Sequence, residues 1–130
     1  MNISTHKVLG DHRGQLIAIE SASSIPFNIK RIFYIFGTQP GIPRGNHAHY
    51  KTKQYLIAVS GFCKVTFDDG QGQITYDLDE PSKGLLQEAM IWGTMHDFSP
   101  DCVLLVLASE HYDENDYIRD YDHFLRQVSQ

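Results

Sequence analysis

The chain has 130 residues, 42% of them hydrophobic, which is enough for one domain with a single sizeable core. Its formal net charge is −5, so it presents no broad basic field, and we expect no nucleic-acid partner. Any anion would have to be bound by local arginines. We predict a single domain over residues 1–130.

The first predicted strands lie at 15–20 and 29–36, where β-branched and aromatic residues are concentrated. Arg31, in the second of these segments, is a candidate for binding an anion, and a solvated strand residue is an equally good interpretation. Tyr34 is a candidate for lining a pocket, although an aromatic stripe on a strand more often belongs to the core.

Residues 43–50, PRGNHAHY, form the most informative segment. Residues two apart on a strand point to the same face, so His47 and His49 share a direction. One histidine alone would more often be a core residue with satisfied hydrogen bonds, but a pair favours function. Arg44 suits bidentate phosphate binding, and Gly45 permits tight backbone geometry beside it. This combination predicts a ligand with a phosphate and an acidic C–H or hydroxyl group.

Further strands are predicted at 54–60, 62–67, 73–79 and 102–109, with an irregular stretch at 85–92. Gly and Pro separate these segments, and Asp69-Gly70 between two alternating segments is a hairpin signal. Many short strands with turns between them predict an all-β barrel or sandwich.

The C-terminal part of the chain has a different period. Asp113 or Asn115 is the predicted N-cap, with acidic residues in the first turn. Four side chains then follow helical spacing: Ile118, Tyr121, Leu125 and Val128. We therefore predict one closing α-helix that packs on the barrel.

Several features favour a cytoplasmic protein without a membrane partner. The first 15 residues lack the apolar core of a signal peptide, and the longest apolar run, 103–108, is too short to span a bilayer. Cys63 and Cys102 lie inside apolar segments, which favours two buried free thiols over a disulfide.

Two motifs resemble those of the cupins. His47 to Gly61 reads H-x-H-x4-Q-x6-G, with Gln54 where the first cupin motif usually has glutamate. Gly84, followed by Gly93-Thr94-Met95-His96, resembles the second motif. Two such motifs in this order predict a cupin jelly roll with a C-terminal helix.

Many cupins bind a metal through histidines and a glutamate. Here the carboxylate is replaced by Gln54, a neutral side chain and a poor ligand for a divalent cation. His47, His49 and His96 could still hold zinc or iron, but we favour a site without metal.

Nearly the whole chain resembles the dTDP-4-keto-6-deoxyglucose 3,4-ketoisomerases, small cupins that make amino-sugar precursors for bacterial surface polysaccharides such as O-antigen. The resemblance is carried by DHRGQLIAIE, IPFNIKRIFYIF, PRGNHAH, GLLQEAMIWGTMHDFS and, most specifically, DCVLLVLASEHYDENDYIRDYDHF. It implies a homodimer that acts on a dTDP-linked 4-keto-6-deoxyhexose without metal or organic cofactor.

The implied reaction suits imidazole chemistry. A hydrogen on the carbon next to a ketone is acidic enough for a positioned base, and an imidazole can remove it and return it to the neighbouring carbon. By the pattern of the ketoisomerases, His47 and His49 are catalytic and His49 is the carbon base. The similar RGxH motif of the 3,5-epimerases would assign that role to His47.

The resemblance also implies binding and specificity residues. Those for substrate and nucleotide are Arg44, Arg31, Tyr34, Asn46, Gln54, Trp92 and His96. His96 is also compatible with a buried structural role. Gln15 and Gly93 lie at positions where family members with different C4 configurations differ, and Gly93 stands where some members carry a large basic residue.

Other functions are compatible with the residues. One is a 3,5-epimerase of the same fold, although those enzymes usually have longer chains. The others are a non-catalytic cupin binding module and a metal-dependent oxygenase, which the absence of the ligand glutamate disfavours.

Overall fold

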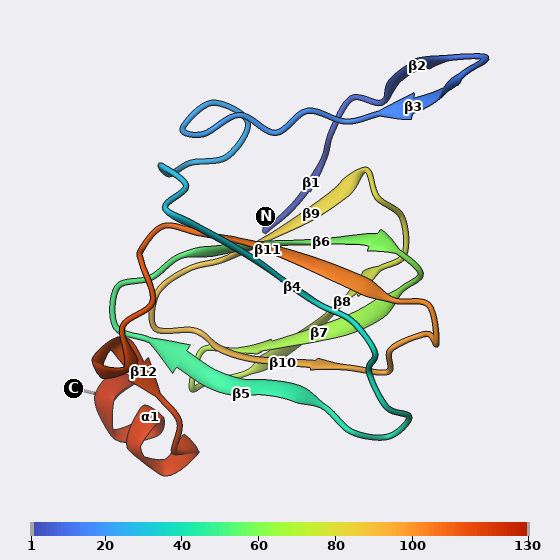
Figure 1. Cartoon of the computed structure of the whole chain (residues 1–130). Helices are drawn as coiled ribbons and strands as arrows, with labels where there is room; N and C mark the ends of the chain where they lie inside the picture. Colours follow the sequence, from blue (N-terminus) through green and yellow to red (C-terminus); the bar gives the residue numbers. More distant parts are fainter. Residues whose placement is uncertain (1, 130) are drawn as a thin grey trace.

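Two five-stranded antiparallel sheets face each other in the computed structural model, which describes residues 2–129 (Figure 1). In order across the first sheet lie β1 (Ile3–Thr5), β9 (Lys83–Gln87), β6 (Gln54–Ser60), β11 (Val103–Ala108) and β4 (Arg31–Ile35). The second sheet contains β12 (Tyr117–Ile118), β5 (Arg44–His49), β10 (Trp92–His96), β7 (Cys63–Asp68) and β8 (Gln73–Leu78). The predicted all-β cupin sandwich with one C-terminal α-helix is confirmed.

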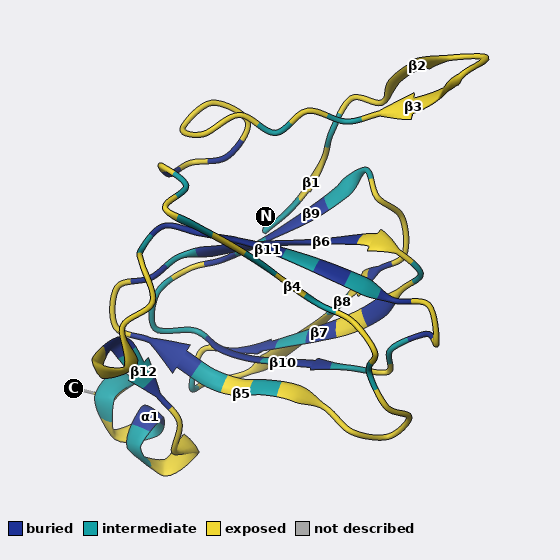
Figure 2. Cartoon of the chain, viewed as in Figure 1, coloured by how far each residue is buried: buried dark blue, intermediate teal, exposed yellow. Residues whose placement is uncertain are grey.

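The core lies between the two sheets, because alternate residues of their strands point inward. Buried side chains of β6, β7, β9, β10 and β11 form this core, among them Leu56, Val65 and Val106. Cys63 and Cys102 are buried in the same cluster as free thiols, as predicted. Figure 2 shows the buried residues gathered on the facing strands and the exposed ones on the loops, on the β2–β3 hairpin and at strand ends.

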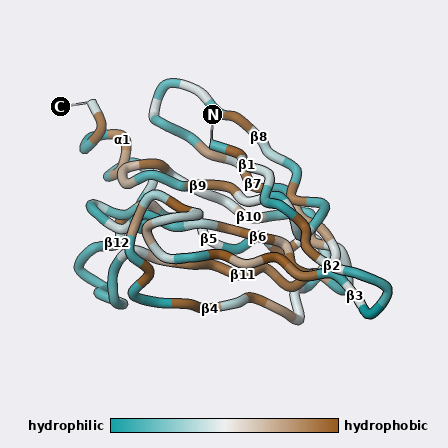
Figure 3. Tube along the Cα trace, turned by 90° about the horizontal axis from the view of Figure 1, so that it is seen from above, coloured by the Kyte–Doolittle hydropathy of each residue, from teal (hydrophilic) through white to brown (hydrophobic). Residues whose placement is uncertain are grey.

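The remaining two strands, β2 (Leu9–Asp11) and β3 (Gly14–Leu16), form a hairpin that extends away from the sandwich (Figure 1). The predicted strand at 15–20 was wrong beyond Leu16, because no strand of this chain pairs with residues 17–20 in the described structure. This segment instead leads to Ile25 and Phe27, which cover the outer face of the first sheet. The hydrophilic tip of the hairpin contrasts with the hydrophobic stretches of β6 and β11 (Figure 3).

The C-terminal segment closes one end of the second sheet. A 3-10 helix, η1 (Glu114–Asp116), leads into β12 and then into α1 (Tyr121–Val128), whose Phe124 is fully buried against the sheet. Asp120 is the N-cap of α1, so the prediction of Asp113 or Asn115 was wrong. Asp113 caps η1 instead. Ile118 is in β12 and not in the helix, since it pairs with Ala48 of β5.

The predicted hairpin at Asp69-Gly70 is confirmed, because β7 and β8 pair from Cys63 opposite Leu78 to Asp68 opposite Gln73. No helix within residues 2–129 has the length and apolar character needed to cross a membrane.

Candidate active site

A row of polar side chains lies at one end of the core. Strand register places Arg31, Ala108, Gln54 and Gln87 side by side across β4, β11, β6 and β9. Directly opposed residues of neighbouring strands share a face. The next row along these strands belongs to the core or packs against it, and it consists of Phe33, Val106, Leu56 and Leu85. The three polar members, Arg31, Gln54 and Gln87, therefore also point between the sheets, and we call them the polar row.

The two histidines face this row from the second sheet. His47 pairs with Gly93, which in turn pairs with the core residue Phe67, so His47 lies on the inner face. His49 is two residues further along β5 and only 2% exposed. The two imidazole centroids are 5.0 Å apart. The prediction that His47 and His49 share one face is confirmed, and that face is the interior of the sandwich.

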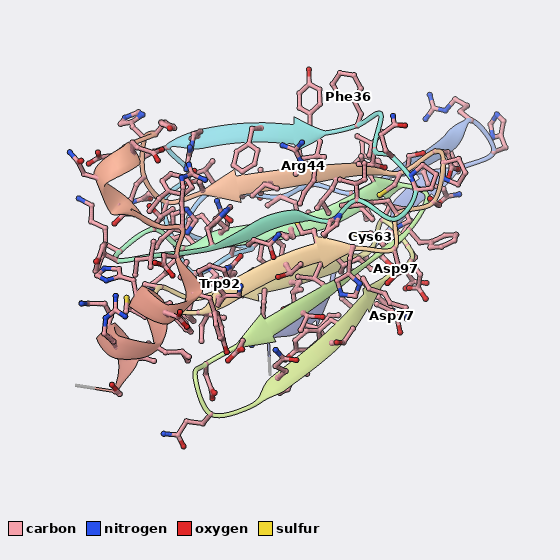
Figure 4. All side chains as sticks on the ribbon, turned by 90° about the horizontal axis from the view of Figure 1, so that it is seen from below. Phe36, Arg44, Cys63, Asp77, Trp92 and Asp97 are labelled. Atoms are coloured by element: carbon pink, nitrogen blue, oxygen red, sulfur yellow. The ribbon has the colours of Figure 1, made fainter. Side chains whose placement is uncertain are left out.

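A bulge in β5 determines where Arg44 lies. The register between β10 and β5 steps from Gly93 opposite His47 to Thr94 opposite Gly45, which leaves Asn46 as an extra residue. Gly45 and Asn46 both have positive φ, 87° and 56°. Arg44 then pairs with the core residue Met95 and comes to the same face as His47, although three positions separate them. In Figure 4 it extends from β5 in the direction of β4.

Burial favours the neutral form of both imidazoles. His47 Nδ1 lies 3.1 Å from the carbonyl oxygen of Gly45, so Nδ1–H donates and Nε2 is left as the basic nitrogen. Burial is the main cause that lowers the pKa of His47. Burial, and secondarily the neighbouring His47, lowers the pKa of His49 to about 4. Two neutral imidazoles side by side are suited to accept protons.

Two buried polar atoms of the site have no hydrogen-bond partner among the described residues: Nε2 of His49 and Nε of Arg31. An unpaired buried polar atom costs roughly 1–3 kcal/mol, so such atoms are rare unless a ligand or water satisfies them. They belong to the facing sheets, His49 to β5 and Arg31 to β4. A ligand with oxygen atoms between the sheets would supply both missing partners.

The sequence analysis did not identify Tyr117, although its ring packs against both imidazoles, with centroids 5.1 Å from His47 and 4.4 Å from His49. The guanidinium of Arg119 lies 4.3 Å from the Tyr117 ring centroid and donates to Glu114 at 2.7 and 2.9 Å. The only sequence signal was the specific C-terminal stretch, because β12 is too short to show a strand pattern.

Asp116 holds the loop that follows His49. Its buried carboxylate accepts hydrogen bonds from the backbone N–H groups of Lys51 and Thr52, at 3.0 and 3.1 Å, and from the Thr52 hydroxyl. Its backbone carbonyl accepts from the N–H of Tyr50 at 3.0 Å. The end of β5, and with it His49, is thereby fixed in place.

Of the other candidates, Gln54 belongs to the polar row and Gly93 lies opposite His47. Asn46 points to the outer face, where its side-chain oxygen accepts a hydrogen bond from Thr94. The structure does not bring Tyr34 or Gln15 to the pair: Tyr34 is 62% exposed on the outer face of β4, and Gln15 lies on the extended hairpin.

Trp92 and His96 lie on the outer face of β10, away from the histidine pair. Trp92 packs against Tyr121 and Phe124 of α1, and Figure 4 shows it beside this helix. His96 hydrogen-bonds Thr66 and Asp97, so His47, His49 and His96 do not form a common set of ligands. Nowhere in residues 2–129 do three His, Cys, Asp or Glu side chains gather closely enough to hold a metal ion.

The site lies along one open side of the sandwich. β4 is the edge strand of the first sheet, and β5 has only the two-residue β12 beyond it in the second. Within the described residues, no strand pairing joins β4 to β5. At this side Arg44 is exposed, Arg31 and His47 are half-buried, and His49 is buried.

Comparisons with known proteins agree on one family. Residues 1–129 match the family model described as FdtA: WxcM-like, C-terminal. The TDP-4-oxo-6-deoxy-alpha-D-glucose-3,4-oxoisomerase of Aneurinibacillus thermoaerophilus is 50% identical over 123 residues, which cover 95% of this chain and 88% of that protein.

Solved structures give the same result. A 3,4-ketoisomerase from Helicobacter canadensis is 46% identical with a TM-score of 0.96, over 98% of this chain and 96% of that one. A His-to-Asn mutant of the 3,4-ketoisomerase QdtA from Thermoanaerobacterium thermosaccharolyticum, in complex with TDP-4-keto-6-deoxyglucose, is 40% identical with a TM-score of 0.94, over 98% and 94%. The 3'-monoepimerase ChmJ from Streptomyces bikiniensis, at 14% identity and a TM-score of 0.77, shares the fold alone.

Proposed function

The chain belongs to the FdtA (WxcM-like, C-terminal) family, whose relatives described above are sugar 3,4-ketoisomerases, and we propose that it converts TDP-4-keto-6-deoxyglucose to a TDP-3-keto-6-deoxyhexose. It is an isomerase. The observation that supports this substrate best is the pair of adjacent imidazoles on the inner face, whose pKa values burial lowers, with Nε2 of His49 buried and without a hydrogen-bond partner among the described residues.

The reaction moves two hydrogens and no heavy atom. An imidazole removes the proton from C3, and the C–H electrons form a C3=C4 double bond while the C4 oxygen gains a proton. The resulting enediol then loses the proton of its C3 oxygen and receives one at C4, which leaves a ketone at C3 and a hydroxyl at C4. Charge that develops on the oxygens is stabilised by nearby donors. Arg31 is such a donor, because its Nε is buried and free of protein partners in the described structure.

We assign proton transfer at the carbon atoms to His49 and proton transfer at the oxygen atoms to His47. His49 is the more buried of the two, and its Nε2 has no partner among the described residues. His47 is anchored through Nδ1 to the Gly45 carbonyl, and its Nε2 can exchange a proton with a hydroxyl at the more accessible side. Arg44, on the same face as His47, binds the diphosphate in this assignment.

The dependence of kcat/KM on pH below neutrality tests whether the His49 imidazole is unprotonated. Because its pKa in the free protein is about 4, below the ordinary 6.5, the imidazole stays a free base as the pH falls through 6.5. We expect kcat/KM to hold down to about pH 5.5 and to decline only towards pH 4. Steady-state rates between pH 4.5 and 8 measure this, and a midpoint near 6.5 would contradict it.

The same shift destabilises the fold at low pH. His49 is neutral in the folded chain but becomes protonated in the unfolded chain below pH 6.5, so stability is lost as the pH falls from 6.5 towards 4. Circular dichroism at each pH is therefore the necessary control for the rate measurements.

Proton NMR in D2O tests the function itself. Purified protein is mixed with TDP-4-keto-6-deoxyglucose in the presence of a chelator, and we expect a 3-keto product with deuterium at C4. The coupling of the C4 hydrogen in a parallel H2O reaction gives the configuration of the product. Deuterium at C5 with inversion there would indicate a 3,5-epimerase, and no exchange at any carbon would indicate a binding protein. Activity lost to the chelator and restored by zinc or iron would establish a metal enzyme.

A homodimer is part of the proposal. Three large side chains on the outer face and end of edge strand β4 are at least 60% exposed: Ile32, Tyr34 and Phe36. An apolar surface on an edge strand favours association with another chain. We expect sedimentation equilibrium to give twice the chain mass, and Tyr34→Asp to give the monomer. Ile74→Asp, a control that is 59% exposed on β8, should leave the dimer intact.

We place the enzyme in the cytoplasm, which the two buried free thiols support, since reducing compartments keep thiols unpaired. Its 3-keto product is a substrate for an aminotransferase, which would lead to an amino sugar of a surface polysaccharide such as O-antigen. This downstream role is supported by the family resemblance alone.

A further inference from the structure

The amide of Gln87 fills the space that Gly93 leaves on the inner face of the second sheet. Gln87 is the last residue of β9, is 5% exposed and stands beside Gln54 in the polar row. A Cβ placed on Gly93 would lie 2.6 Å from Nε2 and 3.2 Å from Oε1 of Gln87. The amide therefore reaches across from the first sheet to the backbone of β10.

This position is next to the catalytic pair. Gly93 is directly opposite His47, and the Cβ atoms of such paired residues are about 4.5–5.5 Å apart. A group that occupies the Cβ position of Gly93 is thus a close neighbour of His47. Gln87 is the member of the polar row whose amide contacts β10, the strand between β5 and β7.

The orientation of the amide is fixed by one hydrogen bond. Nε2 of Gln87 donates to the carbonyl oxygen of Ile91 at 3.0 Å, and a carbonyl can only accept. The second N–H and the oxygen Oε1 make no hydrogen bond to another described residue. This largely buried side chain therefore has one donor and one acceptor available for a ligand.

We propose that Gln87 binds the C3 and C4 oxygens of the hexose beside His47, an inference that rests on the ketoisomerase function proposed above. The free N–H donates to the ketone oxygen, and Oε1 accepts from the neighbouring hydroxyl. The reaction exchanges these two groups while the amide keeps its orientation, because the same N–H can donate to the hydroxyl oxygen that replaces the ketone, and the amide carries no charge. A cation offers donors only, and would favour the ketone or the developing enediolate.

The test replaces Gln87 with leucine, which has a similar size and no hydrogen-bonding group. We expect kcat to fall at least about 10-fold, the effect of losing two hydrogen bonds, while affinity for TDP stays within about twofold. Gly93→Ala is the second variant, since the new Cβ forces the amide away, and we expect a similar loss of kcat. Combining both changes should cost no more than Gln87→Leu alone, because each removes the same contact.

Glu88→Gln is the matched control, because Glu88 is the exposed neighbour of Gln87. It should retain the activity of the unchanged chain. An unchanged kcat in Gln87→Leu overturns the proposal. So does a parallel loss of kcat, TDP affinity and melting temperature, which would show that Gln87 only supports the fold. Failure of the unchanged chain to convert TDP-4-keto-6-deoxyglucose would instead refute the proposed function.

Discussion

Replacing His49 with asparagine is expected to lower kcat by about 10²- to 10⁴-fold and to leave the affinity for TDP-4-keto-6-deoxyglucose close to that of the unchanged chain. Asparagine is small enough for the space and keeps a polar group there, but it has no nitrogen that can accept a proton from carbon. Nε2 of His49 makes no hydrogen bond to the described residues, so its removal breaks no hydrogen bond of the fold and costs only the packing of the ring against Tyr117. Turnover followed by NMR, and binding followed by calorimetry, measure the two quantities separately.

The matched control for this variant is His96→Asn. His96 lies on the outer face of β10, where it bonds Thr66 and Asp97, and its replacement should leave kcat within a few-fold. If His49→Asn keeps its turnover while His47→Asn loses it, the carbon base is His47, as the epimerase-like RGxH motif suggests. If turnover is lost in His96→Asn as well, the outer face of β10 takes part in the site.

The second large effect is expected for Arg44→Ala, which should raise KM by about 10- to 150-fold. A hydrogen bond to a charged group contributes roughly 1.5–3 kcal/mol, and every 1.4 kcal/mol changes an equilibrium tenfold. Because Arg44 is exposed and makes no ion pair within the described structure, its loss should change binding and not folding. Steady-state kinetics gives KM, and titration with TDP alone shows whether the nucleotide part of the substrate is responsible.

Two further variants define what Arg44 contributes. Arg44→Lys keeps the charge but not the forked geometry, so it should recover only part of the affinity. Arg126→Ala removes an exposed arginine from the last turn of α1 and should leave KM unchanged. A KM that is normal in Arg44→Ala would remove this residue from the nucleotide site and leave Arg31 as the remaining candidate.

Local sequence patterns were sufficient for the parts of the site that depend on strand alternation. His47 and His49 had to share a face once their segment formed a strand, and turn signals located the β7–β8 hairpin. Whether that face was the inner or the outer one depends on which strands pair with β5, and no local pattern contains this information. For the same reason the sequence could not show that Trp92 and His96 lie on the outer face of β10, while Gly93 lies on the inner face.

Contacts between distant segments account for what the sequence analysis missed. Tyr117 meets the imidazoles because a two-residue strand pairs with β5, a signal too short to be read from periodicity. Gln87 meets Gly93 across the gap between the sheets. The start of α1 was placed too early because Ile118 fits helical spacing, yet pairing with Ala48 in the sheet determines its conformation.

The extra residue in β5 decides on which face of the strand Arg44 lies. On a regular strand an arginine an odd number of positions before a histidine points to the opposite side, and Arg44 is three positions before His47. The bulge at Gly45 and Asn46 adds one residue without advancing the pairing, so Arg44 lies on the same face as His47. A regular strand with the same four residues would instead place Arg44 on the outer face, opposite to His47, with no change in any side chain. Residue spacing within RGNH is thus as much a part of this site as the chemistry of its members.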